Sequence, residues 1–206
     1  MLYSILKITD GALKNTLAEK CDRQPFIASA PLVWIFLADT KKWRDMYISA
    51  NCWPRKQGAG DALIAMADAL IAVQNAVTAA HSLGLGSCYI GDILENCEDI
   101  RELLKLPEDV FPAAMIVMGY PDARHTNRSK PARFDKKYIV FENHYKALTE
   151  DELRQMYLTR EEQKCRTDTD FESSVAKFYK RKYDSAFCIE MNRSAKEYLK
   201  YFIQDT

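Results

Sequence analysis

Residues 58–94 constrain the fold of this chain more than any other segment. A long helix with almost no charge is predicted from about residue 58 to a glycine-punctuated turn at Gly84, and a short strand is predicted after it. Because its surface is apolar nearly all round, we expect the helix to be buried as the spine of the molecule. The strand ends in Ile90-Gly91-Asp92, where glycine would let the backbone approach a flat ligand.

The same segment raises the question of a membrane span. Residues 69–91 contain no Asp, Glu, Lys or Arg, which is long enough to cross a bilayer. Polar residues nevertheless recur every seven positions along the helix, at Asp61, Asp68, Asn75 and Ser82. A buried helix with one polar seam accounts for this spacing better than lipid does. We therefore expect no membrane span.

The composition is that of an ordinary globular chain. A length of 206 residues predicts one domain with room for an appendage. Lys plus Arg and Asp plus Glu number 29 each, so no overall charge favours nucleic acid or an anionic membrane. The six cysteines are scattered and the N-terminal residues do not resemble a signal peptide. We expect reduced thiols and a cytoplasmic protein.

Several strands and helices follow from the residue pattern. Residues 3–8 predict an edge strand, while the apolar runs at 32–39 and 113–119 predict buried strands. Helices are predicted at 12–21, 41–51 and 100–105, the last with a capping signal from Asn96 and Asp99. Thr149 with Glu152 and Ser194 with Glu197 predict two further helix starts. This order indicates an α+β or an α/β domain.

The simplest site motifs do not fit. Gly84-Leu85-Gly86 has a helix before it and a strand after it, the reverse of a dinucleotide-binding turn, so Gly84 is interpreted as the end of the helix. The three histidines show no metal-ligand spacing, and we expect no metal. Cys88 has no evident His partner and is interpreted as a buried strand thiol.

Two basic segments remain. Residues 177–183 alternate basic and aromatic side chains, but we interpret them as a solvated helix face and expect no nucleic acid. The loop at 122–137 is more suggestive because it follows a buried strand and could hold a phosphate or simply be a solvated basic loop. Its six cations are Arg124, Arg128, Lys130, Arg133, Lys136 and Lys137.

The order of several segments resembles the FMN-dependent nitroreductases. The match consists of APLVWIFLAD, the helix leading through SLGLGSCYIGDI, the stretch IRELLKLPEDVFPAAMIVMGYP and the basic loop SKPARF. The resemblance implies an α+β nitroreductase-like fold, a mainly antiparallel central sheet flanked by helices. It covers a core at residues 1–148, and residues 149–206 resemble a helical C-terminal extension.

The family resemblance implies a homodimer with FMN at its interface and the long helix as a main contact. Tyr89, Ile90, Gly91 and Asp92 match the segment beside the flavin ring, where backbone N–H groups would donate to its N5 and O4 edge. Lys130 and Arg133 match the phosphate-binding positions, with Arg128 as a competitor. NAD(P)H would reduce FMN, which would then reduce a nitroaromatic, quinone or related small-molecule acceptor, and no side chain is expected to be catalytic.

One family feature is missing from this sequence. Family members begin with an Arg-x-Ser-x-Arg segment on the FMN phosphate and ribityl chain, followed by a P-S-x-x-N-x-Q-P segment beside the flavin, and neither occurs here. A phosphate that loses charge-assisted hydrogen bonds of roughly 1.5–3 kcal/mol each binds far more weakly. The alternative hypothesis is therefore a non-catalytic dimer of the same fold that binds a ligand or a partner.

Overall fold

The computed structural model describes residues 1–122, 126 and 129–203. They form two compact units, Met1–Asp122 with Ala186–Thr206, and Ala123–Ser185. The C-terminal helix therefore belongs to the first unit. The sequence-based division at residue 148 follows the family resemblance instead, and it stays a prediction about the extent of the family core.

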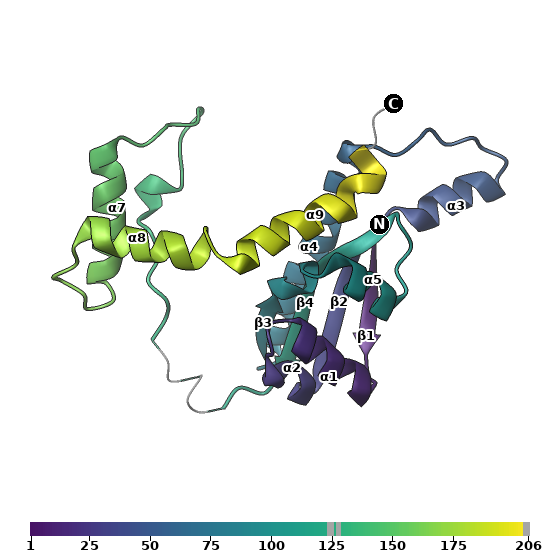
Figure 1. The fold of residues 1–206 in the computed structure, drawn as a ribbon, viewed down its shortest axis with the longest axis horizontal. Helices are drawn as coiled ribbons and strands as arrows, with labels where there is room; N and C mark the ends of the chain where they lie inside the picture. The colour runs from purple at the N-terminus through teal and green to yellow at the C-terminus, as the bar shows by residue number, and fades with distance from the viewer. Residues whose placement is uncertain (123–125, 127–128, 204–206) are drawn as a thin grey trace. The chain divides into compact units, whose positions relative to one another are not determined.

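The first unit is a four-stranded antiparallel sheet covered by helices on both faces (Figure 1). Its strands lie in the order β1-β2-β4-β3, which confirms the predicted α+β class. In chain order the elements are β1 (Tyr3–Ile8), α1 (Gly11–Lys20), α2 (Pro25–Ser29), β2 (Leu32–Asp39), α3 (Lys41–Ser49), α4 (Ala59–Ser82), β3 (Gly86–Ile90), the 3-10 helix η1 (Gly91–Leu94), α5 (Cys97–Leu104), β4 (Val110–Gly119) and α9 (Ala186–Ile203).

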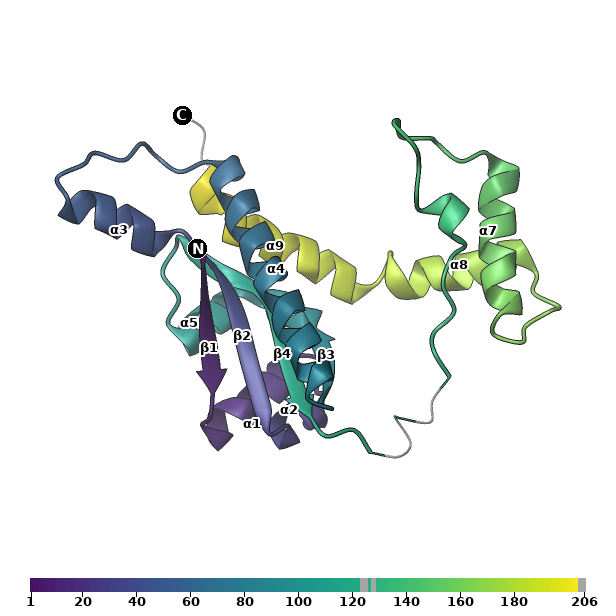
Figure 2. The same cartoon turned by 180° about the vertical axis from the view of Figure 1, so that it is seen from behind.

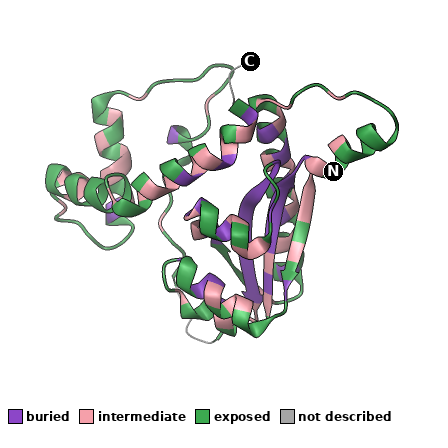
Figure 3. Cartoon of the chain, turned by 45° about the vertical axis from the view of Figure 1, so that its right-hand side comes forward, coloured by how far each residue is buried: buried purple, intermediate pink, exposed green. Residues whose placement is uncertain are grey.

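The two central strands are buried on both faces, as their apolar runs predict (Figure 3). On one face Ile35 and Met115 pack with α1, α2 and α5. On the other face Phe36 and Ile116 pack with Val73 of α4. Because alternate residues of a strand point to opposite faces, one continuous apolar run supplies both layers.

Strand β4 begins earlier than predicted, at Val110, and includes Pro112. The register with β2 shifts there, since Phe36 faces Ala114 whereas Leu37 faces Pro112. Proline has no N–H to donate to a sheet ladder, so a bulge is where a central strand can accommodate it.

Helix α4 covers one face of the sheet, and within the single chain its other side is left uncovered (Figure 2). Its sheet-facing residues are mostly small, including Ala62, Ala65 and Ala69. The opposite side leaves Leu63 and Ile71 each 69% exposed. The helix is long and apolar enough to cross a membrane, and 22% of its most apolar stretch is buried. Removing it into lipid would uncover Phe36 and Ile116, which argues against that placement.

Of two predicted helix starts, the one at Asn96 is found in place without its capping hydrogen bond, and the one at Ser194 is absent. Asn96 does precede α5, but its backbone is left-handed with φ of 52° and its side chain makes no capping hydrogen bond. Ser194 does not begin a helix, because it is buried within α9. The hydroxyl of Ser194 instead accepts a hydrogen bond from the Cys97 backbone N–H of α5 at 2.9 Å. A tertiary contact has therefore replaced both local caps.

The second unit contains the 3-10 helix η2 (Lys136–Tyr138), α7 (Glu150–Glu162) and α8 (Phe171–Lys182). The capping box predicted from Thr149 and Glu152 forms and begins α7. Inside this unit the Arg160 guanidinium lies 4.9 Å from the ring centroids of both Phe134 and Tyr157. The basic face at 177–183 lies on α8, and Phe178 is partly exposed rather than packed inward.

Candidate functional site

The turn at residues 89–92 lies where the edge strand β3 passes into η1. Strand β3 pairs with β4 from Gly86 opposite Gly119 to Ile90 opposite Met115. Ile90 is 1% exposed and holds the end of the strand in the core. The turn is therefore fixed to the sheet on one side and open to solvent on the other.

The backbone at Gly91 is accessible to a ligand. A Cβ atom added there would have no neighbour within 4 Å, so there is open space in front of the main chain. Gly91 and Asp92 begin η1, and the first N–H groups of a helix have no acceptor within that helix. Open space beside such donors fits the carbonyl edge of a flat heterocycle such as a flavin.

Tyr89 is the first residue of the turn and forms a hydrogen bond to the long helix. Its side chain is 44% exposed, and its hydroxyl donates a hydrogen bond to Gln74 Oε1 of α4 at 3.1 Å. Partial burial raises the pKa of Tyr89, so the phenol stays protonated as this donor at neutral pH. The hydrogen bond connects the turn to the exposed apolar side of α4.

Gln24 contacts the turn although nothing in the sequence indicated it. Its side-chain amide donates to the Cys21 carbonyl oxygen at 2.8 Å and to Asp92 Oδ2 at 3.1 Å. The two contacts connect the segment before α2 with η1. Gln24 and Asp92 are 68 positions apart, so no local spacing rule could have paired them.

The surroundings of the turn are acidic. Burial raises the pKa of Glu95, and the nearby carboxylates of Asp92, Asp22 and Glu190 raise it further. Burial, followed by Asp92 and Glu95, likewise raises the pKa of the Cys21 thiol to about 12. A neutral ring edge fits this turn better than a phosphate does, because clustered carboxylates repel an anion.

The predicted phosphate-binding residues belong to the second unit. Lys130 and Arg133 are three residues apart and both are exposed. Two exposed cations have the chemistry that a phosphate requires. The competitor Arg128, and Arg124 of the same loop, lie outside the described residues. The structure thus brings Tyr89, Ile90, Gly91 and Asp92 together in one unit and Lys130 with Arg133 in the other.

Two further candidates can be assessed directly. Cys88 is exposed, which corrects the expectation of a buried thiol. Burial and the Asp92 charge nevertheless raise its pKa, which disfavours the thiolate that a nucleophile needs. Across the described residues, no group of three or more His, Cys, Asp or Glu side chains could hold a metal.

A cavity of about 350 Å³ lies elsewhere in the first unit, against α3 and the start of α4. Its walls include the paired rings of Trp43 and Tyr47, and Arg55, which forms an ion pair with Asp61. None of the residues at 89–92 lines it. The cavity is therefore separate from the turn.

Comparison with known proteins agrees with the fold and the segment order. The model of the family described as "Nitroreductase family" matches residues 4–120. An oxygen-insensitive NADPH nitroreductase of Salmonella typhimurium is 36% identical over 76% of this chain and 65% of its own length. An FMN reductase [NAD(P)H] of Bacillus subtilis is 29% identical over 87% of this chain and 75% of its own. The chain thus spans about two thirds to three quarters of these relatives.

A solved structure extends the similarity to the whole chain. NfrA2 of B. megaterium superimposes with a TM-score of 0.76 and 27% identity. The superposition covers 100% of this chain and 82% of that one. The arrangement of strands and helices described above is therefore shared with a known protein.

Proposed function

This chain belongs to the nitroreductase family, and from that membership we propose that it is an FMN-dependent NAD(P)H oxidoreductase. Bound FMN would supply the two-electron chemistry that connects NAD(P)H with a nitroaromatic, quinone or related acceptor. The observation that carries the proposal is the open backbone at Gly91, beside N–H groups at the start of η1 that have no acceptor within that helix. Relatives named as an NADPH nitroreductase and an FMN reductase support it.

The residues of the turn would hold the flavin ring by position. Ile90 anchors the strand end, and the N–H groups of Gly91 and Asp92 would donate to the polar edge of the flavin ring. Fixed donors stabilise charge that develops on a carbonyl edge without having to reorganise. Lys130 and Arg133 would hold the phosphate. The side chains bind and orient, and none of them needs to transfer a proton.

We propose that the working form is a homodimer formed through α4. The exposed residues Leu63, Leu70 and Ile71 lie on one side of this helix, at positions i, i+7 and i+8. Small residues of α4 face the sheet and large apolar residues face outward. In a helix that packs against one core only, the large apolar residues would face that core. An exposed apolar stripe of this length requires cover, and a second copy of the helix provides it symmetrically. We further propose a soluble, cytoplasmic location.

The test is reconstitution of the purified chain with FMN. We expect absorbance bands of bound flavin and steady oxidation of NADPH or NADH when a quinone is added. A protein that neither carries FMN nor binds added FMN would contradict the proposal. That result would favour the non-catalytic dimer of the same fold.

A further inference from the structure

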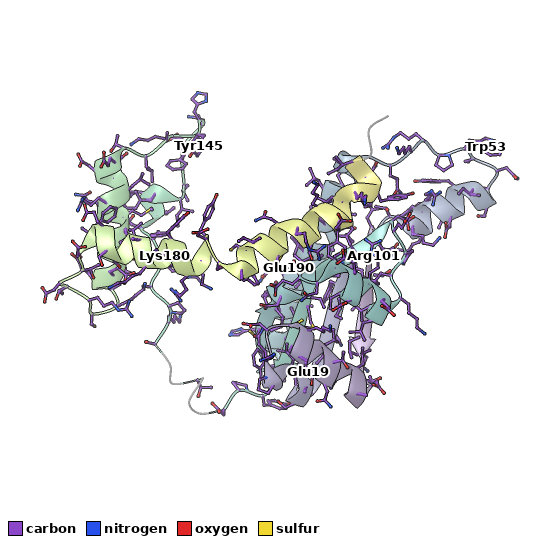
Figure 4. All side chains as sticks on the ribbon, in the orientation of Figure 1. Glu19, Trp53, Arg101, Tyr145, Lys180 and Glu190 are labelled. Atoms are coloured by element: carbon purple, nitrogen blue, oxygen red, sulfur yellow. The ribbon has the colours of Figure 1, made fainter. Side chains whose placement is uncertain are left out.

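The C-terminal helix α9 reaches the segment that follows the 89–92 turn. Glu190 Oε1 accepts a hydrogen bond from the Asn96 backbone N–H at 3.1 Å, and Ser194 Oγ accepts one from the Cys97 N–H at 2.9 Å (Figure 4 labels Glu190). These two N–H groups lie four and five residues beyond Asp92. A single hydrogen bond closes the backbone between the 89–92 turn and these two N–H groups. In it the Glu95 N–H donates to the Asp92 carbonyl oxygen at 3.0 Å.

Asn96 cannot cap α5 by itself. Its backbone is left-handed, and its side chain makes no capping hydrogen bond. The first N–H groups of a helix need acceptors from outside the helix when they are buried. Glu190 and Ser194 supply these acceptors across about a hundred residues of sequence.

The negative charge of Glu190 determines which groups donate and which accept in these hydrogen bonds. Hydrogen bonds from Arg193 and then from Ser194 lower the pKa of Glu190 to about 2, so this side chain is a carboxylate at neutral pH. The Ser194 hydroxyl therefore donates its proton to Glu190, at 2.8 Å, and keeps a lone pair for the Cys97 N–H. Arg193 also binds both oxygens of Glu98, at 2.8 and 2.7 Å.

Helix α9 is itself anchored in the core of the first unit. Tyr198 and Phe202 are buried and pack against Phe111, with ring centroids 6.1 and 5.8 Å apart. Arg101 of α5 lies over the Tyr198 ring at 5.5 Å. A helix held at one end by aromatic packing gives Glu190 and Ser194 a fixed position.

We propose that Glu190 and Ser194 are positioning residues, which set the backbone of the 89–92 turn and thereby the direction of its flavin-binding N–H groups. This inference rests on the proposed function for the identity of the ligand. It gives the C-terminal helix an indirect role in the cofactor site. Glu190 and Ser194 would act through the backbone and would not contact the flavin ring.

Hydrogen exchange on the apo protein tests the positioning without any flavin. We expect Ser194→Ala and Glu190→Gln to speed amide exchange across residues 91–97 by about tenfold or more, because the external acceptors are weakened. The matched controls are Asn192→Ala and Glu197→Gln on the same helix. Asn192 donates a hydrogen bond within α9, to the Cys188 carbonyl oxygen, and Glu197 pairs with Lys200. Unchanged exchange in Ser194→Ala would overturn the proposal.

Flavin binding by the full chain provides the second measurement. We expect the FMN dissociation constant of Ser194→Ala to rise by about tenfold and the circular dichroism of the bound flavin to change. A general loss of stability would not change the FMN affinity or the dichroism of the bound flavin. The control is therefore Ile8→Val in β1, at the opposite edge of the sheet. Ser194→Ala with faster exchange but wild-type FMN affinity and dichroism would overturn the positioning role. A wild-type protein that binds no FMN would instead overturn the proposed function, and the exchange comparison would still decide whether α9 sets the turn.

Discussion

A larger side chain at Gly91 should affect ligand binding without affecting the stability of the fold. Because a Cβ there meets nothing within 4 Å, Gly91→Leu should leave the melting temperature nearly unchanged. The same side chain would fill the space that the flavin edge needs, so FMN affinity should fall by about a hundredfold or more, equivalent to roughly 2.7 kcal/mol. Thermal unfolding and a flavin-fluorescence titration measure the two effects.

The control for this prediction is Gly11→Leu at the start of α1, where a Cβ also meets nothing within 4 Å. It should change neither quantity. Wild-type FMN affinity in Gly91→Leu would show that the ring lies elsewhere.

Glu161 is a buried acidic residue of the second unit. Its side chain is 2% exposed and pairs with Arg160, Lys164 and Arg166. Burial raises its pKa, but the hydrogen bonds from Lys164 and Arg160 outweigh burial and leave the pKa lowered. Glu161→Gln removes the charge that these cations pair with, and should destabilise this unit by on the order of 3 kcal/mol at pH 7.

The pH dependence of that loss follows from the direction of the shift. A carboxyl whose pKa is lower in the folded state stabilises the fold above its unfolded pKa of about 4.3, and this stabilisation is lost as pH falls through the folded value. The difference between wild type and Glu161→Gln should therefore shrink below about pH 4. Denaturant unfolding at pH 7 and at pH 3 measures it, with the exposed neighbour variant Glu162→Gln as control. An equal difference at both pH values would contradict the assignment.

Single residues also show why some side-chain hydrogen bonds could be predicted from the sequence and others could not. The cap at Thr149 depends on partners three residues away, so the pattern alone was sufficient. Ser194 has the same local pattern, yet its hydroxyl contacts Cys97 at a separation of 97 residues. Gln24 beside Asp92 is likewise a product of the tertiary fold. Local spacing cannot contain contacts of this kind.

At the scale of elements, continuous apolar runs predicted β2 and β4 correctly because a strand covered on both faces needs no polar position. The same reasoning predicts cover for α4, and the single chain supplies that cover on one side only. An apolar surface indicates that a helix will be covered, but it does not say whether the same chain provides the cover. In α4 the sheet covers the small residues, and the large ones remain exposed.

This arrangement predicts the effect of a charge on α4. Ile71→Glu places a carboxylate on the exposed stripe, and burying it against a second copy would cost several kcal/mol. We expect a monomer by sedimentation velocity at concentrations where the wild type is a dimer. The fold should persist in far-ultraviolet circular dichroism, because the position is 69% exposed in the single chain.

The matched control is Ile139→Glu, which changes another largely exposed isoleucine outside α4. It should leave the dimer intact. A wild-type protein that sediments as a monomer, or a dimeric Ile71→Glu, would contradict the proposed interface.

At the scale of the whole molecule, the family resemblance correctly predicted the antiparallel sheet and its helical layers. The family resemblance did not predict the distribution of charge around the site. Acidic groups gather behind the 89–92 turn, whereas Lys130 and Arg133 belong to the second unit. The residues proposed for the ring and those proposed for the phosphate therefore belong to different parts of the chain.

Comparing FMN with riboflavin tests that assignment, because the two ligands differ only in the phosphate. The double variant Lys130→Met with Arg133→Met should bind FMN about a hundredfold or more weakly, taking each charge-assisted hydrogen bond at roughly 1.5–3 kcal/mol. Its affinity for riboflavin should equal that of the wild type, since the proposed ring contacts are at residues 89–92. Lys136→Met, in the same segment, should bind both ligands normally. A parallel loss of both ligands would place the two residues at the ring rather than at the phosphate, and an unchanged FMN affinity paired with a weakened Arg128→Met would transfer the phosphate contact to Arg128.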